Sequence, residues 1–106
     1  MTTQIRAWKP FKVNATVNTA VTGSNQTLAL GAGVGLGTVA VRVANIGTQT
    51  IFIDFGTSNT VAATATSIPM LANTVEVFTI PNDVTHIAFV AGTTGSTVYV
   101  TVGEGL

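Results

Sequence analysis

The sequence predicts an all-β protein, an antiparallel β-sandwich or jelly roll of seven or eight strands with no significant helix. Apolar and polar residues alternate with a period of two along most of the chain. The alternating segments recur about every 8 to 12 residues and are separated by glycine, proline and asparagine, a spacing typical of sandwiches and jelly rolls. No segment keeps a helical period. A chain of 106 residues has the size of one domain.

The clearest strands are predicted at residues 38–45 and 50–55, where valine, isoleucine or phenylalanine occupies every second position. The connection at residues 45–48 contains Asn45 and Gly47, which favour a turn, so the two strands are expected to pair as an antiparallel hairpin. In that arrangement Arg42 and Asp54 share the outer face of one sheet.

Further strands are predicted at residues 74–80, 85–90 and 96–102, each bounded by turn-forming residues. Residues 11–21 suit one long strand and residues 26–30 a short one. The alternation assigns one set of side chains to the core, namely Val39, Val41, Val43, Ile51, Ile53, Phe55, Val75, Val77, Val98 and Val100.

The charge content is unusually low and points to a protein that associates. Only 8% of the residues are charged, against about 25% in ordinary domains, and four positive charges balance four negative ones. With 46% hydrophobic residues, such a surface favours association, so partner subunits are expected to cover much of it. A homo-oligomer is expected, with a trimer favoured.

Composition also argues against several classes of protein. The chain has no cysteine, so it forms no disulfide and no thiolate metal site. Its most apolar stretch, residues 28–41, is broken by glycines and falls short of the ~20 apolar residues of a membrane-spanning helix. The first 20 residues lack the apolar core of a signal peptide. No membrane association is therefore expected.

Two segments resemble phosphate-binding loops without meeting their requirements. Residues 31–37 are glycine-rich, but Leu36 stands where a dinucleotide-binding fingerprint needs glycine, and no Lys-Ser/Thr pair follows. Residues 53–60, with Asp54 and Gly56, resemble the first phosphate loop of the actin and Hsp70-type ATPases. That fold needs two large α/β lobes, which 106 residues of strand pattern do not supply.

The remaining candidates do not form an active site. His86 is the only histidine, which excludes a multi-histidine metal centre. The Gly-x-Ser-x-Gly motif of a serine hydrolase is missing. Asp54 and Glu76 could be considered as a carboxylate pair for glycoside hydrolysis, but isolated surface acids in strands are far commoner. We therefore predict a protein that is not an enzyme and has no catalytic, cofactor-binding or metal residues.

The N-terminal segment, residues 1–12, is the candidate for protein–protein contact. Arg6, Lys9 and Lys12 are three of the four basic residues, and they surround Trp8, the only tryptophan. Tryptophan and arginine are enriched at interface hot spots. Three cations are too few for a nucleic-acid site, so no nucleic acid is expected as a partner. The segment is interpreted as an arm, or as the start of the first strand, followed by one sandwich domain at residues 13–106.

Several segments together resemble a known family. The runs at residues 39–47, 51–56, 68–70, 75–78 and 85–88, with the C-terminal run at 99–106, are similar to small capsid decoration, or cement, proteins of tailed bacteriophages. The resemblance implies a β-sandwich on the outer surface of the virion that binds the major capsid protein and stabilises the capsid lattice, often as a trimer. Two alternatives remain, a tail or head-fibre component and a carbohydrate-binding sandwich.

Overall fold

The computed structural model describes residues 9–10, 16–30, 39–81 and 83–104, which contain nine strands and no helix. The strands are β1 (Lys9–Pro10), β2 (Val17–Val21), β3 (Gln26–Ala29), β4 (Val39–Gly47), β5 (Ile51–Gly56), β6 (Ile68–Met70), β7 (Thr74–Ile80), β8 (His86–Ala91) and β9 (Ser96–Glu104). The prediction of an all-β fold is confirmed.

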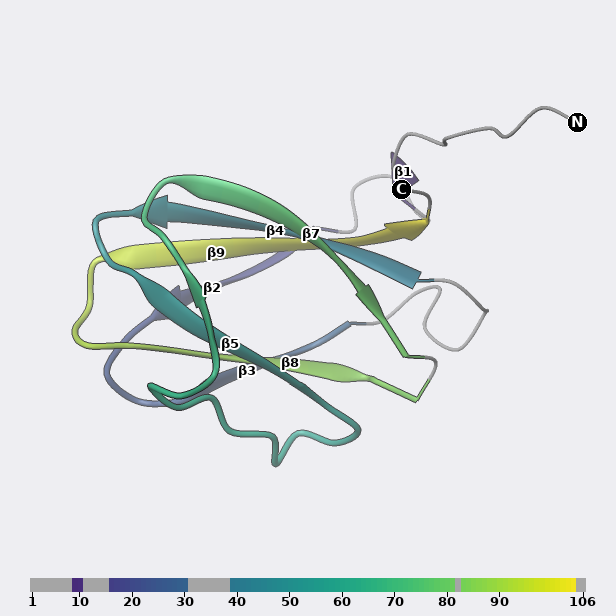
Figure 1. The fold of residues 1–106 in the computed structure, drawn as a ribbon, viewed down its shortest axis with the longest axis horizontal. Helices are drawn as coiled ribbons and strands as arrows, with labels where there is room; N and C mark the ends of the chain where they lie inside the picture. Colours follow the sequence, from purple (N-terminus) through teal and green to yellow (C-terminus); the bar gives the residue numbers. More distant parts are fainter. Residues whose placement is uncertain (1–8, 11–15, 31–38, 82, 105–106) are drawn as a thin grey trace, which may run out of the picture.

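The strands form two antiparallel sheets packed face to face, as Figure 1 shows. The first sheet has the order β1-β9-β4-β7, with β2 also paired to β9, and the second has the order β3-β8-β5-β6. From β2 onward the chain passes repeatedly between the sheets, and only β5 and β6 are consecutive strands in one sheet. This arrangement of eight main strands is a jelly roll.

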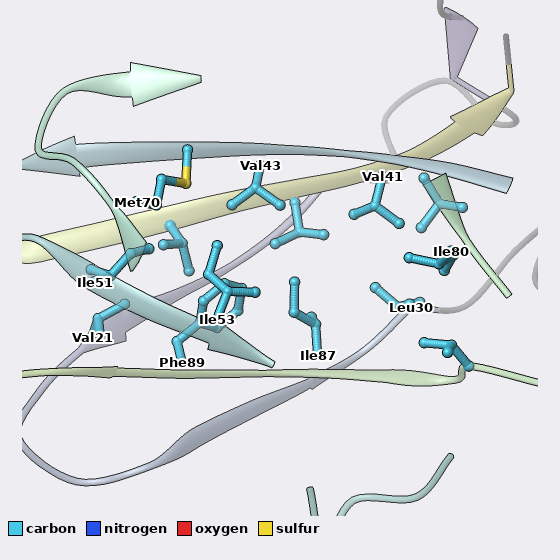
Figure 2. Close-up of a cluster of buried hydrophobic side chains, with 14 of the residues drawn as sticks. Val21, Leu30, Val41, Val43, Ile51, Ile53, Met70, Ile80, Ile87 and Phe89 are labelled. Atoms are coloured by element: carbon cyan, nitrogen blue, oxygen red, sulfur yellow. The ribbon is translucent and has the colours of Figure 1, made fainter. Parts of the chain in front are cut away.

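The core lies between the two sheets, where Figure 2 shows the buried side chains of both layers meeting. Phe89, Ile51, Ile53, Met70 and Ile87 are its largest fully buried apolar members. The prediction of the core is confirmed for seven side chains, namely Val39, Val41, Val43, Ile51, Ile53, Val98 and Val100. One continuous apolar layer thus holds the two sheets together.

The prediction of a hairpin between residues 38–45 and 50–55 is wrong, because these strands lie in different sheets. β4 pairs with β7 and β9, whereas β5 pairs with β6 and β8. Asn45 is a fully buried member of β4 rather than a turn residue, and the chain crosses between the sheets after Gly47. Arg42 and Asp54 consequently lie on the outer faces of opposite sheets.

The crossing from β4 to β5 requires glycine at the last residue of β4. Gly47 has a φ of 141°, and a Cβ atom there would overlap the carbonyl oxygen of Gly95. The amide of Thr48 donates to that same carbonyl over 3.1 Å. The turns after β4 and after β8 are therefore packed against each other at one end of the sandwich.

The predicted parity of β7 is also wrong. The register pairs Val41 with Phe78 and Val39 with Ile80, so these even-numbered residues of β7 face the core. Val75 is 48% exposed and Val77 is half-buried, because both lie on the outer face. β7 is apolar on both faces, and pairing with β4 decides which set is buried.

Phe55 differs from its prediction for another reason. It lies near the end of β5 and is half-buried, with its ring packed on the core and in edge-to-face contact with Phe78 at 5.6 Å. The predicted strand at residues 26–30 corresponds to β3, and the described part of the predicted strand at 11–21 corresponds to β2. β6 is an additional strand that the alternation does not predict, because it has three residues and contains Pro69.

Candidate protein interface

One of the four predicted interface residues lies in the described part of the chain. Lys9 belongs to β1 and lies opposite Glu104 of β9, while Pro10 lies opposite Gly103. β1 has a partner strand on one side only, a position that tolerates proline because no second ladder needs its missing N–H. Arg6, Trp8 and Lys12, like the glycine-rich loop 31–37, lie outside the described residues.

The outer face of the first sheet presents a patch of apolar side chains that the sequence analysis did not predict. Val75 of β7, Ala44 of β4 and Tyr99 of β9 lie side by side across three paired strands. Ile46 follows Ala44 on the same face, and Ile46, Val75 and Tyr99 are 51%, 48% and 41% exposed. We call these four residues the outer-face patch.

Few charged residues lie on this face. Arg42, which lies between Val77 and Thr101, is the one charged residue that β2, β4, β7 and β9 place on the face within their described parts. Contiguous exposed apolar residues on a sheet of low charge are typical of protein interaction sites. The outer-face patch is therefore a candidate interface.

A surface hollow adjoins the patch at the side of the sandwich where β6 and β7 are the outermost strands. It has a volume of about 380 Å³ and is lined by Pro69, Leu71, Thr74, Val75 and Glu76. Leu71, in the corner between the two strands, is 66% exposed. Val75 belongs both to the hollow and to the outer-face patch, so the two features form one continuous surface.

The other polar residues singled out in the sequence have structural partners. Asp54 accepts hydrogen bonds from the amide of Phe55 at 2.9 Å and the hydroxyl of Ser67 at 3.3 Å. His86 is half-buried, with its Nδ1 2.8 Å from the Thr85 hydroxyl. Asp54 and Glu76 lie in different sheets and do not form the carboxylate pair considered above.

The segment at residues 53–60 ends β5 and enters a surface turn. Ser58 and Thr60 share a hydroxyl hydrogen bond of 2.6 Å, and the amide of Val61 donates to the Ser58 carbonyl over 3.4 Å. The polar atoms of this turn therefore form hydrogen bonds with one another, as is common in turns rich in serine and threonine.

Within the described ranges, no three histidine, aspartate or glutamate side chains gather as a group able to hold a metal ion. No helix there is long and apolar enough to cross a membrane.

Comparison with known sequences adds no family to these observations. No protein-family model matches the chain, and no curated protein matches it. The surfaces described above therefore carry the functional argument.

The sequence contains a sign of the outer-face patch, but alternation alone does not distinguish it from the pattern of core residues. β7 reads Val75, Val77 and Phe78, so apolar residues occupy both parities, and Tyr99 alternates with core valines in β9. Apolar residues on both faces of a strand indicate either burial on both sides or an interface.

Proposed function

We propose that the protein is a non-enzymatic structural protein of a phage virion. It binds the outer surface of the capsid through the major capsid protein and stabilises the lattice of capsid subunits. It acts as a homo-oligomer, with a trimer favoured.

The outer-face patch is the observation that carries this proposal. Three of its side chains are between 41% and 51% exposed on one side of a sheet, namely Ile46, Val75 and Tyr99. Val75 belongs to β7, which also lines the adjoining hollow. A surface of this kind favours contact with protein, and many identical contacts across a shell add their effects through avidity. The jelly-roll topology supports the proposal, since jelly rolls recur in viral capsid proteins.

The resemblance of the strand sequences to capsid decoration proteins supports the same function independently of the patch. A tail or head-fibre component has the same requirements for a rigid sandwich and an apolar contact surface, and it remains the second candidate. A carbohydrate-binding module is less well supported, because sugar-binding sandwiches present a platform of exposed aromatic rings. In the part of the chain that the structure describes, Tyr99 is the one aromatic residue classed as exposed.

Cosedimentation with empty, expanded capsids of the cognate phage tests the proposal. We expect saturable binding, and electron microscopy of the decorated particle is expected to show density on the outer surface. The variants Ile46→Lys and Tyr99→Lys should lower occupancy, because each places a charge in the outer-face patch. Thr93→Lys is the matched control, since Thr93 is exposed in the loop between β8 and β9.

A protein that binds isolated tails, and not capsids, would favour the second candidate. A protein that binds neither would contradict a virion role altogether. If the Thr93→Lys control lowers occupancy as much as the two patch variants, the assignment of the outer-face patch to the contact is wrong.

A further inference from the structure

The first observation is that β7 is an open sheet edge. It pairs with β4 on one side, and no strand described in the structure pairs with its other side. At seven residues it is the longest strand with a single partner, since β2 has five residues, β3 four, β6 three and β1 two. A free edge presents unpaired N–H and C=O groups that another extended segment can use.

The second observation is that β7 has few of the features that protect such edges. Lysine, proline and bulges commonly prevent an edge strand from pairing with another chain. β7 contains no lysine and no proline, and its register with β4 runs without interruption from Thr74 to Ile80. Glu76 is its one charged residue.

The third observation is that the hollow described above lies along this edge. Thr74, Val75 and Glu76 of β7 line it together with Leu71 and Pro69. Its volume of about 380 Å³ is at the lower end of ligand pockets, and it suits a single large side chain. An open edge beside such a hollow is the arrangement by which a sheet binds an extended peptide, with backbone hydrogen bonds for affinity and the hollow for specificity.

The chain itself contains a segment with the matching chemistry. Residues 1–12 carry Arg6, Lys9 and Lys12 and no acidic residue, whereas Glu76 is the only charged residue that lines the hollow. Residues two apart in an extended segment point to the same side, so a segment bound in that conformation would present Arg6 and Trp8 together. An indole in the hollow would thus bring a guanidinium toward Glu76.

The register places β1 far from the hollow of its own chain. Pro10 lies opposite Gly103, Gly103 opposite Ala40, and Ala40 opposite Thr79. The hollow is three strand spacings across the sheet from β1 and four residues along β7 from Thr79, a separation of about 20 Å. The Cα atom of Trp8 is only about 4 Å from that of Lys9, which β1 holds beside β9.

We propose that the N-terminal segment of one copy binds along β7 of a second copy and places Trp8 in the hollow beside Glu76. This inference deepens the proposed function and rests on its homo-oligomer. Because β1 and β7 lie at opposite edges of one sheet, the contact joins two different surfaces and is repeated from copy to copy. A contact between two different surfaces forms a ring when the rotation from copy to copy closes, and a closed ring of three copies would be the favoured trimer.

Crosslinking between two singly substituted chains tests the contact directly, since the natural chain has no cysteine. An Ala7→Cys chain mixed with a Val75→Cys chain and treated with a short bismaleimide should give a covalent heterodimer. Mixing Ala7→Cys with Asp83→Cys is the matched control, since Asp83 is exposed in the loop after β7, at the other end of that strand from the hollow. Equal yields from the two mixtures would overturn the proposal.

Fluorescence of the single tryptophan gives a second readout in the full-length protein. As concentration rises and copies associate, Trp8 emission should move to shorter wavelength while light scattering reports a larger mass. Glu76→Lys should raise the dissociation constant about fivefold or more, and Asp83→Lys, the same change at another exposed acid, should leave it unchanged.

A protein that stays monomeric at all concentrations, or that associates without a change in Trp8 emission, would overturn the proposal. Capsid cosedimentation separates this failure from that of the proposed function. A chain that binds capsids without forming the heterodimer contradicts only the contact between copies. A chain that forms the heterodimer and ignores capsids contradicts only the virion role.

Discussion

Asn45 lies where the crossing from β4 to β5 meets the corner between β6 and β7, and its amide group holds the two together. The side chain is fully buried, and its Nδ2 donates to the carbonyls of Gln49 and Leu71 at 3.0 Å and of Met70 at 3.3 Å. Its Oδ1 accepts no hydrogen bond from any described residue, so the side chain acts as a donor only. We predict that Asn45→Ala and Asn45→Asp both destabilise the fold, and that Asp costs more.

The loss of unfolding free energy in Asn45→Ala depends on how many of the three carbonyls still accept a hydrogen bond from another side chain. The Gln49 carbonyl still accepts from the Ser96 hydroxyl at 3.1 Å, and the Leu71 carbonyl from the Thr74 hydroxyl at 2.7 Å. The Met70 carbonyl has no replacement from a side chain, but it keeps its place in the ladder opposite Ile51 of β5. The lost buried hydrogen bonds cost about 0.5–1.5 kcal/mol and the small cavity adds about 1 kcal/mol, giving about 1.5–2.5 kcal/mol.

Asn45→Asp keeps the volume of the side chain and reverses its polarity. A carboxylate oxygen in place of the Nδ2 group would face three carbonyl oxygens in a buried site, without a donor to compensate it. A buried charge without a partner costs about 3–5 kcal/mol. Asp therefore destabilises more than Ala although it leaves no cavity.

Urea unfolding followed by circular dichroism measures both effects. With an m-value of about 1.5 kcal/mol per molar, a loss of 3 kcal/mol lowers the midpoint by about 2 M. Asn18→Asp, the same change at an exposed position of β2, is the control and should lower the midpoint little. An Asp variant that is as stable as the Ala variant, or more stable, would show that packing rather than hydrogen bonding decides the role of Asn45.

Three further predictions follow from burial and backbone geometry. Ile53→Ala should cost about 2–5 kcal/mol in unfolding free energy through its cavity, and Ile68→Ala, at the 43% exposed residue paired with it, should cost clearly less. Gly47→Ala should lower the unfolding free energy by at least about 1–3 kcal/mol, because its φ is 141° and its Cβ would overlap a backbone oxygen; Gly92→Ala, with open space around its Cβ, should be close to neutral. Deleting residues 1–12 should leave the melting transition cooperative, because the buried cluster begins at residue 21, while occupancy on capsids falls; a large loss of melting temperature with binding retained would contradict this.

The alternation of apolar and polar residues predicted much of the fold, because it depends only on where a strand lies and which of its faces is buried. Residues 74–80 coincide with β7, and the buried parity is correct in β4, in most of β5 and in β9. Gly47 also marked a true change of direction, whereas Asn45 did not. The glycine did not indicate whether the next strand would lie beside β4 or across the core, because that choice depends on contacts remote in sequence.

The candidate interface was harder to predict for the same reason. Val75 and Phe78 are both apolar, and only the pairing of Phe78 with Val41 shows that Val75 lies outside. β6 is three residues long and contains Pro69, so it has too little pattern to predict. All the residues that line the hollow lie within residues 69–76, but the hollow forms only because β6 and β7 belong to different sheets, which the segment itself does not reveal.

A single exposed valine in a strand needs no functional explanation, because β-branched residues favour strands and much of any protein surface is apolar. The outer-face patch differs, since the register places Val75 and Tyr99 on either side of Ala44, with Ile46 next on the same strand. Ala44 is only 7% exposed, because its larger neighbours cover it, so the patch is continuous. Val75 also lines the hollow at the open edge of β7. A copy bound along that edge would therefore cover one side of the patch, and the remainder, around Ile46 and Tyr99, would stay available to a capsid subunit.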